Sequence, residues 1–205
     1  YSHMKNHKKK YLIIYLGIAL FIINCNIKQY QADSSPVFLP SNTLNYIGTP
    51  VSPFDRSSLA FSDQGAWFAY GFSSEENKAL GFSGPFLMTQ GHGEWISKGL
   101  SQLELINTQT KEILNLSHFS VSQTSYNSHL EQLLENKKIK IKQTLFYNSA
   151  HSAIITNQIT NLSEEAIAIQ PIWKGTIFST GLQIAKDKNT ITLTTDRSTA
   201  KGIIQ

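Results

Sequence analysis

The chain has 205 residues, of which 40% are apolar, and its 18 basic residues exceed its 14 acidic residues by four. Lys5 and the three lysines at positions 8–10 supply that whole excess, so the rest of the chain is neutral. Neutrality excludes a nucleic-acid binder, which would need a net basic face to neutralise phosphates. The single cysteine excludes an internal disulfide and a thiolate metal site, so a packed apolar core must stabilise the fold.

An export signal is predicted over residues 1–25. Three lysines at 8–10 precede an apolar run over residues 11–24, and this run is shorter than the roughly 20 residues of a membrane-spanning helix. Cys25 ends the run in a sequence that resembles the box at which bacterial lipoproteins are cleaved and acylated, although Asn24 replaces the usual small residue. We therefore predict lipidation of Cys25 and an exported lipoprotein, periplasmic or in the outer membrane. An uncleaved anchor, or cleavage at another bond, is the alternative.

Residues 26–58 are predicted to form a tether followed by an irregular arm. Pro36, Pro40, Pro50 and Pro53 interrupt any regular element in this part of the chain. The remaining residues, 59–205, are numerous enough for one domain with its own core.

Short segments of β-branched, aromatic and alternating residues follow one another from residue 103, separated by polar turns. The segments are 103–106, 113–116, 119–126, 139–147, 153–160, 166–173 and 190–195. The first two flank a polar pentapeptide and are expected to form a hairpin, and Gln143 interrupts the apolar alternation of the fourth. Residues 128–135 allow either a short helix or a strand. Many strands with short loops predict an all-β fold, an antiparallel sandwich or barrel.

No group of residues has the spacing of a catalytic or metal site. Four histidines follow the signal: His92, His118, His129 and His151. They are too far apart in sequence to predict metal ligation. Ser83 stands between glycines, but the spacing is not that of a nucleophile elbow, and residues 81–84 are predicted to form a turn. The acidic pairs 75–76 and 164–165 are expected to be solvated in polar loops. We predict no catalytic residue, no metal and no cofactor.

Trp67 and Trp95 are the candidate residues for binding carbohydrate or another domain. An exposed indole ring offers a flat apolar surface on which a sugar ring stacks or a second domain packs. Packing in the core is the default expectation for each of them and for Trp173.

Five stretches of the chain resemble one family in their order and spacing. They are Phe-Ser-Asp-Gln-Gly-Ala-Trp at 61–67, Gly-Phe-Ser-Gly-Pro at 81–85, and the segments 139–147, 154–161 and 172–175. Together they resemble the N-terminal domain of bacterial glucosidases of the YgjK type, in glycoside hydrolase family 63. The likeness extends from about residue 54 to residue 195, and its most specific parts are the Gly-Ala-Trp and Trp-x-Gly motifs.

The resemblance implies an antiparallel super-sandwich that packs against a following (α/α)6 barrel. In the family the acid and base carboxylates lie in that barrel and act by inversion, so no catalytic residue carries over to this chain. The resemblance also implies that residues 67–72 and 81–86 border the face that meets the barrel. The implied partners are the barrel, an oligosaccharide bound by the whole enzyme, and a membrane reached through the lipid anchor.

We therefore predict the non-catalytic N-terminal domain of an exported α-glucosidase-like hydrolase that acts on α-linked glucosides or oligosaccharides. The sandwich over residues 59–205 would be incomplete and would lack the catalytic barrel. One alternative is a free-standing carbohydrate-binding envelope lipoprotein, which would expose a patch of tryptophans where a docking domain exposes a broad apolar face. The other alternative is a structural envelope lipoprotein, which would bind no sugar.

Overall fold

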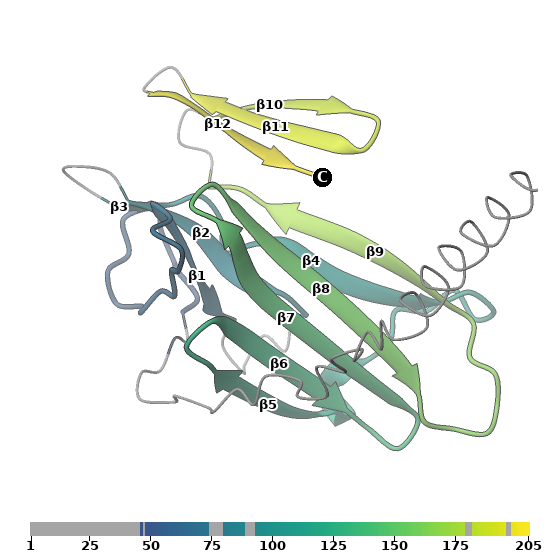
Figure 1. Cartoon of the computed structure of the whole chain (residues 1–205). Helices are drawn as coiled ribbons and strands as arrows, with labels where there is room; N and C mark the ends of the chain where they lie inside the picture. The colour runs from purple at the N-terminus through teal and green to yellow at the C-terminus, as the bar shows by residue number, and fades with distance from the viewer. Residues whose placement is uncertain (1–45, 47, 74–79, 89–92, 179–181, 196–197) are drawn as a thin grey trace, which may run out of the picture. The chain divides into compact units, whose positions relative to one another are not determined.

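The computed structural model describes residues 46, 48–73, 80–88, 93–178, 182–195 and 198–205. These residues form strands and one short 3₁₀ helix, η2 (Leu116–His118) (Figure 1). The strands are β1 (Phe68–Phe72), β2 (Phe82–Met88), β3 (Gly93–Trp95), β4 (Gly99–Asn107), β5 (Ser120–Ser125), β6 (His129–Glu135), β7 (Ile139–Ser149), β8 (Ser152–Asn161), β9 (Ile169–Thr176), β10 (Leu182–Asp187), β11 (Thr190–Thr195) and β12 (Ser198–Ile204). All their pairings are antiparallel, which confirms the predicted fold class.

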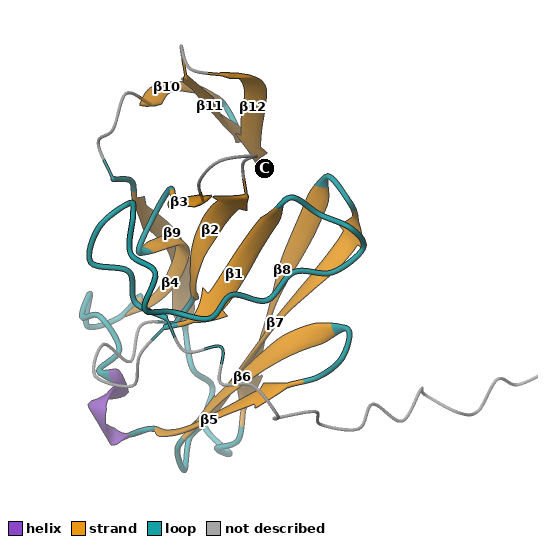
Figure 2. Ribbon diagram, turned by 90° about the vertical axis from the view of Figure 1, so that its left-hand side faces the viewer, coloured by secondary structure: helices purple, strands orange, loops and turns teal. Residues whose placement is uncertain are grey.

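Two layers of sheet enclose the core. One layer is the four-stranded sheet β5-β6-β7-β8, and the other combines the sheet β1-β2-β3 with the pair β4-β9 (Figure 2). A bridge between Leu80 and Leu103 links the two parts of the second layer. Strands β10, β11 and β12 form a further three-stranded sheet. Antiparallel layers that pack face to face are the arrangement of a β-sandwich.

Two apolar clusters join the layers. The first includes Phe82 on β2 and Leu145 on β7, and the second includes Leu105 on β4 and Ile141 on β7. Each of these four side chains is at most 2% exposed. Burial of one such side chain stabilises the fold by about 1.5–3 kcal/mol, so β7, which contributes to both clusters, is central to the stability of the sandwich.

The strands β6 and β7 alternate between the core and the outer face. Every second residue of β7 from Ile139 to Tyr147 is buried, Gln143 included, and the residues between them are half-buried. β6 has the same period of two, so residues 128–135, which allowed a helix or a strand, contain a strand. The outward residues of these two strands therefore form a surface on the far side of the core.

Of two local predictions, one is wrong and one is confirmed. Residues 81–84, expected to form a turn, lead into β2, where Ser83 is fully buried and its hydroxyl lies 3.4 Å from the Phe72 carbonyl oxygen. The expected hairpin of 103–106 with 113–116 forms over a short length: Ile106 and Ile113 make an antiparallel bridge, and the Leu114 amide donates to the Leu105 carbonyl oxygen at 2.7 Å.

The predicted arm, as far as the structure describes it, belongs to the packed domain. Residues 48–58 have no regular secondary structure, but Pro50 is fully buried. The Gly48 amide donates to the Phe72 carbonyl oxygen at 2.8 Å, and the Trp95 amide donates to that of Pro53 at 2.7 Å. These contacts attach the segment to β1 and β3.

Several predictions fall on residues outside the described ranges, among them those for Cys25, His92 and the acidic pair 75–76. Among the described residues, no helix has the length and apolarity needed to cross a membrane. The same part of the chain contains no group of three histidine, cysteine, aspartate or glutamate side chains placed to hold a metal ion.

Candidate functional site

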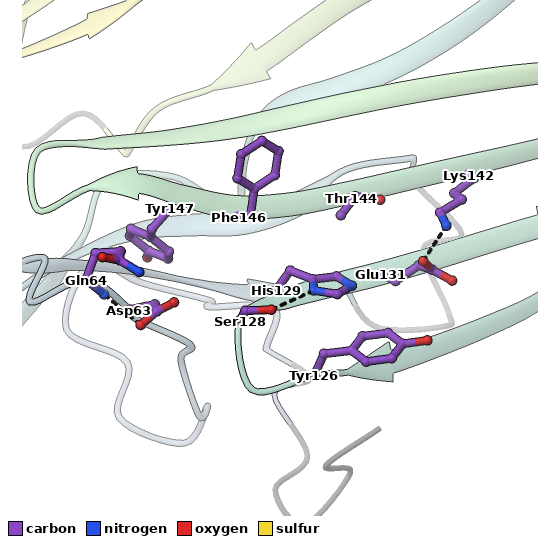
Figure 3. Close-up of a pocket in the computed structure, with 10 residues that line it drawn as sticks. All are labelled: Asp63, Gln64, Tyr126, Ser128, His129, Glu131, Lys142, Thr144, Phe146 and Tyr147. Atoms are coloured by element: carbon purple, nitrogen blue, oxygen red, sulfur yellow. Dashed lines mark hydrogen bonds and ion pairs between the residues drawn. The ribbon is translucent and has the colours of Figure 1, made fainter. Parts of the chain in front are cut away.

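A pocket of about 600 Å³ opens on the outer face of β6 and β7 (Figure 3). The outward residues of these strands line it: His129 and Glu131 on β6, and Lys142, Thr144 and Phe146 on β7. His129 is paired across the strands with Phe146, and Glu131 with Thr144. The volume falls in the range of about 300–1,000 Å³ that is typical of small-molecule sites.

A tight turn between β5 and β6 builds the aromatic part of the pocket. Asn127 and Ser128 form the turn, and the Tyr126 amide donates to the His129 carbonyl oxygen at 2.9 Å. This hydrogen bond brings the Tyr126 ring parallel to the imidazole of His129, with 4.3 Å between the centroids and 12° between the planes. Phe146, the cross-strand partner of His129, also lines the pocket.

An ion pair lies at one end of the pocket. The ammonium of Lys142 is 2.7 Å from a carboxylate oxygen of Glu131, and their side chains are 41% and 20% exposed. Thr144 lies between this pair and Phe146 in the view of Figure 3. This end therefore offers a carboxylate, an ammonium and a hydroxyl to a ligand.

A loop before β1 supplies the other end. Gln64 has a positive φ of 55°, and its amide donates to the Asp63 carboxylate at 2.7 Å. The Ala66 amide donates to the Asp63 carbonyl oxygen at 3.0 Å and closes a tight turn. The buried hydroxyl of Tyr147 lies 3.0 Å from the Phe61 carbonyl oxygen and 2.8 Å from that of Phe68. Burial raises the pKa of Tyr147 well above its ordinary value, so this hydroxyl remains a donor that holds the loop against β7.

Burial lowers the pKa of His129 below its ordinary value of 6.5. The Glu131 carboxylate raises this pKa, and the Lys142 ammonium lowers it, but burial is the largest effect. The Ser128 hydroxyl lies 3.1 Å from the Nδ1 atom of the ring. The imidazole is therefore neutral at pH 7, in contact with an aromatic neighbour and a hydroxyl.

We predict that His129 makes the folded protein less stable in acid. In the unfolded state the imidazole binds a proton near pH 6.5, while in the native state it stays neutral to lower pH. The contribution of this group to the free energy of unfolding is therefore fully present above pH 6.5 and is lost as the pH falls. Between about pH 7 and pH 5, the free energy of unfolding should fall less steeply in His129→Gln than in the wild type. Urea denaturation at several pH values measures both slopes.

Parallel slopes for the two proteins would contradict this prediction. The titration of Asp55 does not contribute to the slope of the free energy of unfolding in that pH range. The Ser57 hydroxyl, 2.5 Å from its carboxylate, holds the pKa of Asp55 below the ordinary value of 3.8, so that contribution is lost only in stronger acid.

The two predicted tryptophans have different environments, and neither lines the pocket. Trp95 is 1% exposed, its indole N–H donates to the Asp55 carbonyl oxygen at 2.9 Å, and its ring centroid is 5.1 Å from that of Phe86. It therefore presents no free face to a sugar or to a second domain. Trp67 is 65% exposed and Trp173, on β9, is 55% exposed.

Tyr126 and Phe146 were not singled out by the sequence analysis, and His129 was considered only as a metal ligand. For His129 and Phe146 the signal is the alternation of β6 and β7, because residues out of phase with the buried leucines and isoleucines must face outward. Tyr126 follows β5 and lies outside this pattern. Alternation alone does not show which outward residues lie side by side. That requires the strand register.

The pocket does not have the arrangement of a glycosidase centre. Such a centre needs one carboxyl group that carries a proton for the leaving oxygen and a second that acts as base or nucleophile. Glu131 is ion-paired with Lys142, and Asp63 accepts a hydrogen bond from its own turn. Both carboxylates therefore have local partners within the domain.

Comparison with curated protein sequences finds no match. A comparison with protein-family models matches residues 55–199 to the family described as glucosidase YgjK, N-terminal. The match covers most of the 205 residues and includes the pocket, both core clusters and the segments on which the resemblance was based. The chain therefore belongs to the family of the N-terminal domain of glucosidase YgjK.

Proposed function

We propose that this chain is the non-catalytic N-terminal β-sandwich domain of an exported glycoside hydrolase that acts on α-linked glucosides or oligosaccharides. The observation that carries the proposal is the family match over residues 55–199. In this arrangement the acid and base carboxylates belong to an (α/α)6 barrel in the same protein, against which the sandwich packs. The engaged carboxylates of the pocket agree with this division of roles.

The contact with the barrel is proposed to involve the segment before β1 and the end of β2. Five large apolar side chains in these parts of the chain are exposed: Val51, Phe54, Leu59, Trp67 and Leu87. The aromatic residues of the flanking strands are mostly buried, as Phe72 and Phe82 show with 3% and 2% exposure. The contact would therefore rest on these exposed side chains and not on the strands as a whole.

Hydrolysis by the chain and by a complete enzyme tests the proposal. We expect the purified 205-residue chain to leave maltose and an aryl α-glucoside intact, and a protein that also carries the barrel to release β-glucose first from the aryl α-glucoside, as inversion requires. Proton NMR of the first product distinguishes the anomers. Turnover by the 205-residue chain that is lost in Glu131→Gln or Asp63→Asn would refute the division of roles, and α-glucose as first product would refute inversion.

We further propose that residues 1–25 direct export and that Cys25 is acylated. Several acyl chains, at about 0.8 kcal/mol per buried CH2 group, would hold the protein stably at a membrane surface. Cys25→Ser should move the protein from the membrane fraction to the soluble fraction. Mass spectrometry that finds an intact N-terminus and an unmodified Cys25 in membrane-bound protein would contradict acylation.

A further inference from the structure

We propose that the pocket on the outer face of β6 and β7 binds a neutral saccharide. All the residues that line it belong to the sandwich. The inference rests on the proposed function only for the choice of α-linked glucose oligosaccharides as probes. The shape, the rings and the charges of the pocket support it independently.

The aromatic part matches the apolar face of a pyranose ring. Tyr126, His129 and Phe146 are half-buried and therefore partly open to a ligand. Stacking and the short turn fix the first two rings, so a sugar that packs here orders few additional side chains. Because the imidazole of His129 is neutral, the ring surface carries no charge where the C–H groups of a sugar would pack.

The polar groups match the hydroxyl edge of a sugar. Figure 3 shows Asp63 and Gln64 at one end of the pocket and Glu131 with Lys142 at the other, with the His129 and Phe146 rings between them. A pyranose on the rings would direct its hydroxyls toward both ends. The carboxylates accept hydrogen bonds, the ammonium donates them, and the Thr144 hydroxyl does either.

The charges favour a neutral ligand over an anionic one. Two carboxylates, Asp63 and Glu131, line the pocket against the single ammonium of Lys142, which already faces Glu131 at 2.7 Å. A phosphate or uronate would meet net negative charge and find no free cation among the lining residues. Sugar phosphates and nucleotides are therefore excluded as ligands.

The test is titration of the 205-residue chain with maltotriose, followed by ¹⁵N–¹H NMR in a detergent without a sugar headgroup. We expect shifts at residues of the pocket, and an affinity about tenfold lower in Phe146→Ala, since one stacking partner is lost. Ile154→Ala is the matched control, because Ile154 pairs with Phe146 on β8, is 39% exposed and does not line the pocket. It should bind like the wild type.

A second pair of variants covers the case in which Phe146→Ala fails to fold. Thr144→Val removes a pocket hydroxyl with little change of shape, and Thr156→Val makes the same change at its exposed cross-strand neighbour on β8. Weaker binding in the first variant alone supports the site. Equal binding in all variants, shifts that cluster around Trp67, or glucose 6-phosphate binding as tightly as glucose would overturn it.

These outcomes are distinguishable from failure of the proposed function. Maltotriose binding that depends on Phe146 and Thr144 supports the pocket whether or not a barrel-containing protein hydrolyses maltose. An inverting enzyme whose sandwich domain shows no shift with maltotriose or glucose overturns the pocket and leaves the proposed function intact.

Discussion

Replacing Trp95 by alanine is expected to lower the free energy of unfolding by about 3–5 kcal/mol, a large part of the stability of a domain of this size. The indole is 1% exposed, so its removal leaves a cavity beside Phe86. The Asp55 carbonyl oxygen also loses the donor that lies 2.9 Å away. The irregular segment before β1 would then lose one of its attachments to β3. Urea denaturation followed by circular dichroism measures the change.

Trp67 provides a matched control, because the same substitution at a side chain that is 65% exposed should change stability by no more than about 0.5 kcal/mol. Trp95→Phe should fall between the two, since it keeps most of the apolar volume but removes the N–H donor and part of the ring. Similar losses in Trp67→Ala and Trp95→Ala would contradict the placement of Trp95 in the core. The comparison separates two tryptophans that the sequence alone treats alike.

The strand β7 was the most predictable element, because its inward residues repeat every second position. Gln143 interrupts the apolar pattern in the sequence, yet it keeps its inward position and is fully buried. Its side-chain amide donates to the Asn157 carboxamide oxygen at 2.5 Å. The apolar residues on both sides fix the register, since a slip of one residue would expose all of them. The single polar residue Gln143 therefore does not change the register that these apolar residues fix.

The strands β1, β2 and β3 were not predicted, and β2 begins in a stretch whose Gly and Pro residues are typical of turns. Gly84 would place a Cβ atom 2.9 Å from the Ala69 carbonyl oxygen, so glycine is needed there for close approach between β1 and β2. Sequence rules assign a Gly-Pro pair to a turn because they consider only local conformation. The crowding that selects glycine at this point comes from a neighbouring strand.

The pocket depends on contacts that sequence reasoning does not supply. Its floor follows from the register of β6 with β7, which places His129 beside Phe146. Its far end is formed by the loop at Asp63, which precedes His129 by more than sixty residues in the sequence. The hydroxyl of Tyr147 holds this loop in place. Each side chain is a common surface residue of a strand or turn by itself. Only the packing of the two layers brings them together.

The Trp-x-Gly motif at the end of the family resemblance has a physical explanation in the pairing of β4 with β9. The register shifts between Gly99 and Gln102, so that two residues of β4, Leu100 and Ser101, lie opposite Gly175 alone. This is a β-bulge, in which the strand with the extra residue bends and the local twist increases. A Cβ atom on Gly175 would lie 2.2 Å from the Leu100 carbonyl oxygen and 3.0 Å from its carbonyl carbon.

Gly175→Ala is therefore expected to destabilise the domain by about 2–3 kcal/mol, the effect of overpacking a site that cannot relax. The atoms that a methyl group would meet are backbone atoms of β4, so the two strands must separate at the bulge. Amide hydrogen exchange should become faster in β4 and β9, and urea denaturation gives the overall loss. Gly202→Ala is the control: its nearest contact, with the Leu193 Cβ at 3.4 Å, is ordinary, and a change within about 0.5 kcal/mol is expected. If Gly175→Ala unfolds and exchanges like the wild type, the close approach of β4 to β9 at this glycine is wrong.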